Sequence, residues 1–260
     1  MHNFYKLNWK ADRVVLDSLV FRLQHFKNDQ TWDLGDQCFI FYKSVELINQ
    51  YVNFFQLRPN FKPKNILELG MFEGGSIAFW YEILNPEKIV GIDISIQDPS
   101  YLKRYISENG LQENIKMYWG TSQTDSQKLN EICLFEFPNG FDLVFDDASH
   151  LYPYSKKSFE ILFPLMNPGG MYVIEDWAWG HWPEYQKIND PYFTEENEPT
   201  KLVFELVEAV GSHSSYISSI TIYGGFVAIE RSATPWLNNN ESIELSKEFE
   251  LENEISRRSK

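Results

Sequence analysis

NILELGMFEGGS, residues 65–76, decides the fold, because a short apolar run ends in an acid and a glycine-rich turn, and helix-length sequence follows. The run NILEL has the length and composition of a strand buried on both faces. Gly70 and Gly74 permit a tight turn and a close approach of the backbone to a ligand, and Ser76 is placed to cap the next helix. We therefore predict a ligand-binding turn at the carboxyl end of a parallel strand.

The same alternation continues toward the C-terminus. Further apolar runs occupy residues 88–93, 115–119, 141–145 and 171–175, with helix-length segments at 76–85, 99–110, 125–135 and 155–163. This alternation is typical of a parallel sheet with crossover helices. The final stretch YISSITIYGGFVAIE, residues 216–230, predicts two paired strands. The predicted fold class is therefore α/β, mostly parallel with an antiparallel final strand.

The segments on either side of this sheet differ in character. Residues 36–57 predict a helix rich in Phe, Tyr, Leu and Ile, closed by Arg58-Pro59. We predict residues 1–61 to be an N-terminal helical cap or oligomerisation segment and expect a homo-oligomer. Residues 62–232 are predicted to form the sheet domain, with a lid at 177–200, where a long stretch lacks periodicity. Residues 233–260 are predicted to form a polar extension.

Charge and cysteine content exclude several classes of partner. The chain has 23 basic and 37 acidic residues, a net charge of −14, which repels phosphate backbones and anionic membranes. We expect neither nucleic acid nor membrane as a partner. Cys38 and Cys133 lack metal-ligand spacing and suit a reducing compartment. The apolar stretch VVLDSLVFRL, residues 14–23, is interrupted by two charges, so we expect a cytoplasmic protein.

The acid before the glycine turn distinguishes between cofactors. A dinucleotide site calls for GxGxxG, which this turn lacks, and Glu68 would repel a pyrophosphate. An NAD-dependent oxidoreductase is therefore the weaker hypothesis. A ligand that carries a cationic amine and a sulfonium would be attracted to Glu68. Asp93, at the end of the second run, is placed to bind a ribose diol.

Acidic pairs end the fourth and fifth apolar runs, in VFDDASH and MYVIEDW. If the two strands are neighbours, four carboxylates converge, and they repel one another unless a cation joins them. Oxygen ligands favour Mg²⁺, with Mn²⁺ and Ca²⁺ as rivals, and helix capping or pairing with lysine is the alternative. The carboxylates concerned are Asp146, Asp147, Glu175 and Asp176.

The order of these features resembles class I S-adenosylmethionine-dependent methyltransferases over residues 62–231. The resemblance implies a Rossmann-like sheet and S-adenosylmethionine as the cofactor. The stretch GTSQTD, residues 120–125, is similar to the family's adenine-contacting segment, with helix capping as the alternative. The cofactor-binding residues that we predict are Glu68, Gly70, Gly74, Ser76, Asp93, Ser122, Gln123 and Asp146.

The pattern FDxVxDDxSH followed by an acidic pair more closely resembles metal-dependent O-methyltransferases. These include the macrolide sugar O-methyltransferases and the cephalosporin hydroxylase-type family. Carried over by position, the resemblance implies Asp147, Glu175 and Asp176 as metal ligands and His150 as the general base. Catechol-type O-methyltransferases are also similar, but they carry a lysine as the base. The MFEGG sequence of the turn departs from the small or threonine-containing sequence of the hydroxylase-type relatives.

The leading hypothesis is therefore a metal-dependent O-methyltransferase that methylates one hydroxyl of a vicinal diol. Its acceptor is expected to be a small molecule, a sugar or another natural-product intermediate. An alcohol is a weak nucleophile, so a cation that polarises it and a histidine that removes its proton are the required aids. A catechol or polyphenol O-methyltransferase is the nearer alternative. A non-catalytic accessory protein of the cephalosporin hydroxylase type is the other.

Overall fold

The chain divides into two compact units, residues 1–121 and 122–260. The computed structural model describes residues 2–10, 12–23, 38–96, 99–183, 197–212 and 216–233. The division falls inside residues 62–232, which the sequence predicts to be one domain. Residues 184–196 of the predicted lid and 234–260 of the predicted extension lie outside the described residues.

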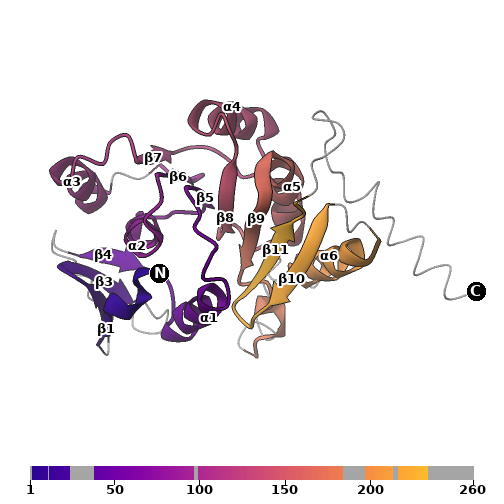
Figure 1. The fold of residues 1–260 in the computed structure, drawn as a ribbon, viewed down its shortest axis with the longest axis horizontal. Helices are drawn as coiled ribbons and strands as arrows, with labels where there is room; N and C mark the ends of the chain where they lie inside the picture. Colours follow the sequence, from indigo (N-terminus) through magenta and orange to yellow (C-terminus); the bar gives the residue numbers. More distant parts are fainter. Residues whose placement is uncertain are drawn as a thin grey trace, which may run out of the picture. The chain divides into compact units, whose positions relative to one another are not determined.

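Unit 1 contains two groups of strands (Figure 1). In the N-terminal sheet, of order β1-β2-β3-β4, the pairs β1/β2 and β2/β3 are antiparallel and β3/β4 is parallel. In the second group, β5, β6 and β7 pair in parallel. The elements are η1 (Asn3–Lys6), β1 (Leu7–Trp9), β2 (Arg13–Leu16), β3 (Leu19–Leu23), β4 (Phe39–Phe41), α1 (Val45–Gln56), β5 (Asn65–Leu69), α2 (Gly75–Leu84), β6 (Lys88–Ile92), α3 (Ser100–Glu108) and β7 (Ile115–Tyr118).

The prediction of a helical N-terminal segment is wrong for most of its length. Among the described residues of that segment, only α1 is a long helix; it begins at Val45, where the hydroxyl of Ser44 accepts a hydrogen bond from Leu47 N at 3.1 Å. Before it, the buried rings of β4 pack against neighbouring strands, and Phe21 stacks on Phe39 at 5.0 Å between centroids. An apolar run of three residues is too short to show the hydrophobic period of a helix or of a strand. Tertiary packing therefore determines that this segment is a strand.

The described residues of unit 2 include four strands in the order β10-β11-β9-β8. The pair β8/β9 is parallel, whereas β9/β11 and β11/β10 are antiparallel. The elements are α4 (Ser126–Glu136), β8 (Phe141–Asp146), α5 (Tyr152–Leu162), η2 (Phe163–Leu165), β9 (Met166–Glu175), η3 (Trp179–His181), α6 (Thr200–Ser212), β10 (Ile217–Ile222) and β11 (Phe226–Arg231).

The predicted α/β fold class is confirmed, with parallel strands joined by helices and an antiparallel end. The five predicted sheet strands correspond to β5, β6, β7, β8 and β9, and the predicted paired strands are β10 and β11. Strand β9 begins five residues before the predicted run, and α5 begins three residues early. Within the described ranges, no helix is both long and apolar enough to span a bilayer.

Candidate functional site

The glycine turn of unit 1 has the backbone geometry that its sequence requires. Gly70 and Gly74 have φ values of 82° and 76°, in the left-handed region that favours glycine. Gly74 is the N-cap of α2, so the predicted capping role of Ser76 is wrong. Ser76 is instead a buried residue within the first turn of α2. The turn therefore presents backbone N–H groups at the positive end of a helix.

Asp93 lies beside this turn and is held in a fixed orientation. Its Oδ2 accepts a hydrogen bond from Phe72 N at 2.8 Å, and its Oδ1 accepts from Ser95 N at 2.8 Å and Ser95 Oγ at 2.5 Å. Phe72 adopts a φ of 45°, uncommon for a bulky residue. The MFEGG turn thus uses the backbone of Phe72 to fix Asp93, a contact that the sequence pattern did not reveal.

Glu68 is the remaining predicted site residue of unit 1, and two further residues of the turn lie close to it in the chain. Glu68 lies on β5 with none of its surface exposed. Glu73, in the turn itself, is half-buried, and burial raises the pKa of its carboxyl above the ordinary value. Its neighbour Phe72 contacts Tyr42 edge to face, with 4.9 Å between ring centroids. Aromatic and acidic groups therefore flank the turn.

Asp146 lies in a buried polar network of unit 2. Its carboxylate accepts hydrogen bonds from Ser158 Oγ at 2.5 Å, Tyr172 Oη at 2.8 Å and Gln123 Nε2 at 3.3 Å. Burial raises the pKa of Asp146 to about 6, although the Ser158 and Tyr172 hydroxyls act in the opposite direction. The side chain predicted to face the cofactor is thus occupied by contacts within the unit. Its role toward a cofactor stays a prediction.

Gln123 connects this network to the loop that carries His150. Besides its contact with Asp146, the Gln123 amide donates to Ser158 Oγ at 3.3 Å and accepts from Ser149 N at 3.1 Å. Ser122 contacts Thr124 through their hydroxyls at 3.0 Å. Of the two residues predicted to contact adenine, Gln123 therefore hydrogen-bonds both the last residue of β8 and the loop that follows it.

Asp147, His150 and Asp176 come together at the ends of β8 and β9. Each offers one ligand atom, and these atoms all lie within 4.8 Å of one another. His150 Nε2 lies 3.7 Å from Asp147 Oδ1, and both side chains are partly exposed. His150 Nδ1 is buried and has no hydrogen-bond partner among the described residues. The structure thus assembles an imidazole and two carboxylates from two adjacent strands.

Two residues of this cluster have an unusual backbone conformation. His150 and Asp176 have φ values of 54° and 51°, a region that costs a non-glycine residue about 1–2 kcal/mol. Such strain persists only where the surroundings enforce it, and it concentrates at functional sites. The cluster therefore depends on contacts that hold both turns.

Three hydrogen bonds to other segments of unit 2 hold the loop after β8. Gln123 accepts from Ser149 N, as described above. Trp179 Nε1 donates to the His150 carbonyl at 2.6 Å, and Tyr152 N donates to the Asn197 carbonyl at 2.7 Å. Trp179 is 5% exposed and lies three residues after Asp176. It therefore links the turn after β9 to the turn that carries His150. The sequence WAWGHW does not reveal which of its tryptophans makes this contact.

The expectation that four carboxylates converge is only half met. Asp146 points to the face of the sheet shared with Tyr172, against α5, because β8 and β9 pair with Val144 opposite Tyr172. Glu175 is buried on β9, opposite Phe226 of β11, and is not part of the cluster of potential ligands. Side chains alternate between the two faces of a strand, which separates the members of each acidic pair. Metal ligation by Glu175 stays a prediction.

The donor atoms fit a hard divalent cation. Octahedral ligands at 2.0–2.1 Å from Mg²⁺ lie about 3 Å apart when adjacent and about 4 Å apart when opposite. The ligand atoms of the cluster lie within 4.8 Å of one another, a limit somewhat wider than that span, so the side chains would have to draw closer together to bind one ion. Two carboxylates and one imidazole also suit Mn²⁺. The absence of any thiolate from the cluster disfavours structural zinc.

Comparisons with known proteins agree with this geometry. Residues 67–177 match the family model of a methyltransferase domain. Demethylmacrocin O-methyltransferase of Streptomyces fradiae is 33% identical over 133 residues, which cover 48% of this chain and 30% of that protein. The 8-demethyl-8-(2-methoxy-alpha-L-rhamnosyl)-tetracenomycin-C 3'-O-methyltransferase of Streptomyces olivaceus is 31% identical over 131 residues, with the same coverage of 48% and 30%.

A solved structure has a related fold. The MycE methyltransferase from the mycinamycin biosynthetic pathway, in complex with Mg and SAH, matches with a TM-score of 0.54 and 25% identity, covering 75% of this chain and 49% of that one. The matched part of the chain spans only about a third of the length of the curated relatives.

Proposed function

Because the chain resembles class I S-adenosylmethionine-dependent O-methyltransferases, and macrolide sugar O-methyltransferases in particular, we propose that it methylates one hydroxyl of a vicinal diol. S-Adenosylmethionine is the methyl donor and a divalent cation the second cofactor. The acceptor is a small molecule, a sugar or another natural-product intermediate. The observation that carries the proposal is the cluster of Asp147, His150 and Asp176 within residues 67–177, the segment that matches the methyltransferase domain.

The glycine turn and Asp93 hold the cofactor in this proposal. The turn offers backbone N–H groups at the start of α2 to the carboxylate of the methionine portion. Asp93 is oriented by Phe72 and Ser95. A carboxylate oxygen has two lone pairs, so Asp93 retains capacity to accept hydrogen bonds from the ribose hydroxyls. Glu68 supplies negative charge that favours the cationic donor over a dinucleotide.

Asp147 and Asp176, with Glu175 as the further predicted ligand, would hold the cation. A bound Mg²⁺ supplies a Lewis acid that lowers the pKa of a hydroxyl and orients neighbouring oxygens. The presence of Mg in the MycE complex supports this part of the proposal. Asp176 has a φ of 51° and offers a carboxylate oxygen within 4.8 Å of one from Asp147.

His150 acts as the general base. Nε2, the nitrogen nearer Asp147, takes the proton of the acceptor hydroxyl while the oxygen attacks the methyl group. Asp147 stabilises the imidazolium that forms. Positioned bases of this kind contribute roughly 10²- to 10⁴-fold to a rate.

The direct test is methyl transfer from labelled S-adenosylmethionine to a rhamnosyl-bearing acceptor. We expect His150→Ala to lower the rate roughly 10²- to 10⁴-fold while cofactor affinity is kept. His181→Ala is the matched control, because that ring contacts Thr200 Oγ1 at 3.1 Å and Glu198 at 3.9 Å instead of Asp147. Full activity of His150→Ala would exclude the base.

The acceptor class and the metal are tested in the same assay. An acceptor in which one hydroxyl of the diol is replaced by hydrogen is expected to be a poor substrate. Chelation is expected to abolish transfer, and Mg²⁺ to restore it. Faster turnover of catechol than of the sugar would favour the polyphenol alternative. Activity that survives exhaustive chelation would refute the metal role.

A further inference from the structure

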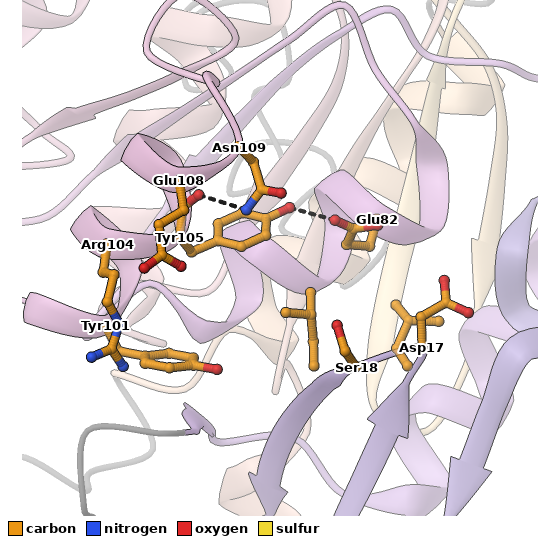
Figure 2. Close-up of a pocket in the computed structure, with 10 residues that line it drawn as sticks. Asp17, Ser18, Glu82, Tyr101, Arg104, Tyr105, Glu108 and Asn109 are labelled. Atoms are coloured by element: carbon orange, nitrogen blue, oxygen red, sulfur yellow. Dashed lines mark hydrogen bonds between the residues drawn. The ribbon is translucent and has the colours of Figure 1, made fainter.

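Unit 1 contains a cavity of about 450 Å³ that the proposed methyl transfer does not use. Three parts of the unit line it: the turn between β2 and β3, the C-terminal end of α2, and one face of α3 (Figure 2). Its volume lies in the range of small-molecule sites. The principal lining residues are Asp17, Ser18, Glu82, Tyr101, Arg104 and Glu108.

The cavity is separate from the glycine turn. Glu82 is near the end of α2, whereas Gly74 caps its beginning. At 1.5 Å per residue, roughly 10 Å of helix separates them. The cavity includes no residue that we assign to cofactor, metal or catalysis. Ligand binding in this cavity is therefore independent of the proposed methyl transfer.

The walls of the cavity are rich in hydrogen-bonding groups. Tyr105 is buried, and its hydroxyl donates to Glu82 Oε1 at 2.5 Å. This contact fixes the Glu82 carboxylate at the wall, where Oε2 has no hydrogen-bond partner among the described residues. The hydroxyls of Ser18 and Tyr101 also line the cavity (Figure 2). Leu16 and Leu19 are the aliphatic contributors. Such a wall suits a hydroxylated ligand better than an apolar one.

The charges of the lining favour a cation. Asp17 is already paired with Lys6 at 2.8 Å. Glu82 and Glu108 have no ion-pair partner among the described residues, and they outnumber Arg104, whose guanidinium lies over the Tyr101 ring at 5.0 Å. Carboxylates that lose water to a neutral ligand are left uncompensated. A ligand with one positive charge restores the balance, and an anion is repelled.

From this combination of volume, hydroxyl groups and excess carboxylate, we propose that the cavity binds a small hydroxylated amine of the amino-sugar kind. Its ammonium contacts Glu82, with Glu108 adding a longer-range attraction. Its hydroxyls bind Ser18 and Tyr101. Such a site gives the chain a second ligand besides the methyl donor and acceptor.

Three probes with the same ring and different charge test this proposal: glucosamine, glucose and glucuronate. Binding to the full chain is followed by NMR, in a mildly acidic buffer in which the amine is protonated. We expect glucosamine to bind at least about tenfold more tightly than glucose, since an ion pair is gained, and glucuronate to bind least. Equal affinity for glucosamine and glucose would overturn the proposal.

Matched variants distinguish specific binding in the cavity from general electrostatic attraction of a cation to an acidic protein. Glu82→Gln keeps an acceptor for the Tyr105 hydroxyl and removes the charge, so the preference for glucosamine should fall about tenfold. Glu108→Gln should weaken it less. Glu87→Gln is the control, because Glu87 is exposed, pairs with Lys64 at 2.7 Å and lies outside the cavity. An equal loss in Glu82→Gln and Glu87→Gln would refute the site.

Discussion

Asp146 and Asp147 are adjacent in the chain but occupy different environments. Asp146 is buried among Ser158, Tyr172 and Gln123, whereas Asp147 is partly exposed beside His150. The pleat of β8 sends the two side chains in different directions. Burial of Asp146 carries a cost that Asp147 avoids, and this cost has a measurable pH dependence.

The free energy of unfolding should depend on pH through Asp146. Its folded-state pKa of about 6 lies above the ordinary value of about 3.9. The folded state therefore binds the proton more tightly, so the contribution of Asp146 to stability is fully present below about pH 4 and is lost as the pH rises through about 6. The expected loss is up to about 3 kcal/mol.

The Asp146→Asn variant isolates this effect, because a neutral amide does not titrate. Urea unfolding of both proteins at pH 4.5 and pH 7.5 should show a smaller decrease for the variant than for the wild type. Ionisation of the other carboxyl groups is common to both proteins and cancels in the comparison. Equal decreases would show that the Asp146 carboxyl has an ordinary pKa in the folded protein.

The sequence could predict which residues belong to the candidate site more readily than how their side chains are directed. Asp147 and Asp176 follow two apolar runs, and parallel neighbours end at the same edge, so their meeting could be predicted. The direction of Asp146 and Glu175 depends on the phase of the pleat. The left-handed conformation of His150 depends on contacts of its loop with Trp179 and Gln123, which are distant from it in the chain. Asp176 is held by its N–H, which donates to the Gly225 carbonyl at 2.9 Å.

At the scale of elements, the indole of Trp179 joins the turn η3 to the loop after β8. Trp179 donates to the His150 carbonyl at 2.6 Å. Trp179→Phe keeps most of the ring volume but removes the N–H. We expect the loop that carries Asp147 and His150 to lose its fixed position relative to Asp176, and affinity for Mn²⁺ to fall roughly 10- to 100-fold, measured by calorimetry.

Trp177→Phe is the control for that change. Its indole N–H also donates to a carbonyl, that of Tyr223 at 2.8 Å, which lies in the turn between β10 and β11. The variant loses the same kind of hydrogen bond on the same segment. If both variants bind Mn²⁺ with equal weakness, or if Trp179→Phe binds it normally, the link through Trp179 does not position the cluster.

Two helical glycines should respond in opposite ways to alanine. A Cβ at Gly75 would lie 1.8 Å from the carbonyl oxygen of Ile40, which is part of β4, whereas a Cβ at Gly211 meets no atom within 4 Å. Gly75→Ala should destabilise the fold by about 1–3 kcal/mol or more. Gly211→Ala should stabilise it by up to about 1 kcal/mol through helix propensity.

Denaturant midpoints of the two glycine variants test this difference in one experiment. The result also tests the close packing of the N-terminal sheet on α2, which the sequence did not predict. If Gly75→Ala is as stable as the wild type, the contact with Ile40 is looser than the structure indicates.

For the whole molecule, the length and order of apolar runs made the α/β fold predictable. Strands covered on both faces are continuous apolar runs, and β5, β6 and β8 are of that kind. The N-terminal sheet could not be predicted from the sequence, because β1, β2 and β4 have only three or four residues each. Strands that short give little periodicity, so their pairing partners decide the structure.

Binding of S-adenosylmethionine tests the central claim most directly. The full chain is titrated calorimetrically with S-adenosylmethionine and separately with NAD, each with Mg²⁺ and again after chelation. We predict micromolar binding of S-adenosylmethionine and no binding of NAD. Absence of S-adenosylmethionine binding under both metal conditions would contradict the methyltransferase account and favour a non-catalytic role for the cluster at Asp147, His150 and Asp176.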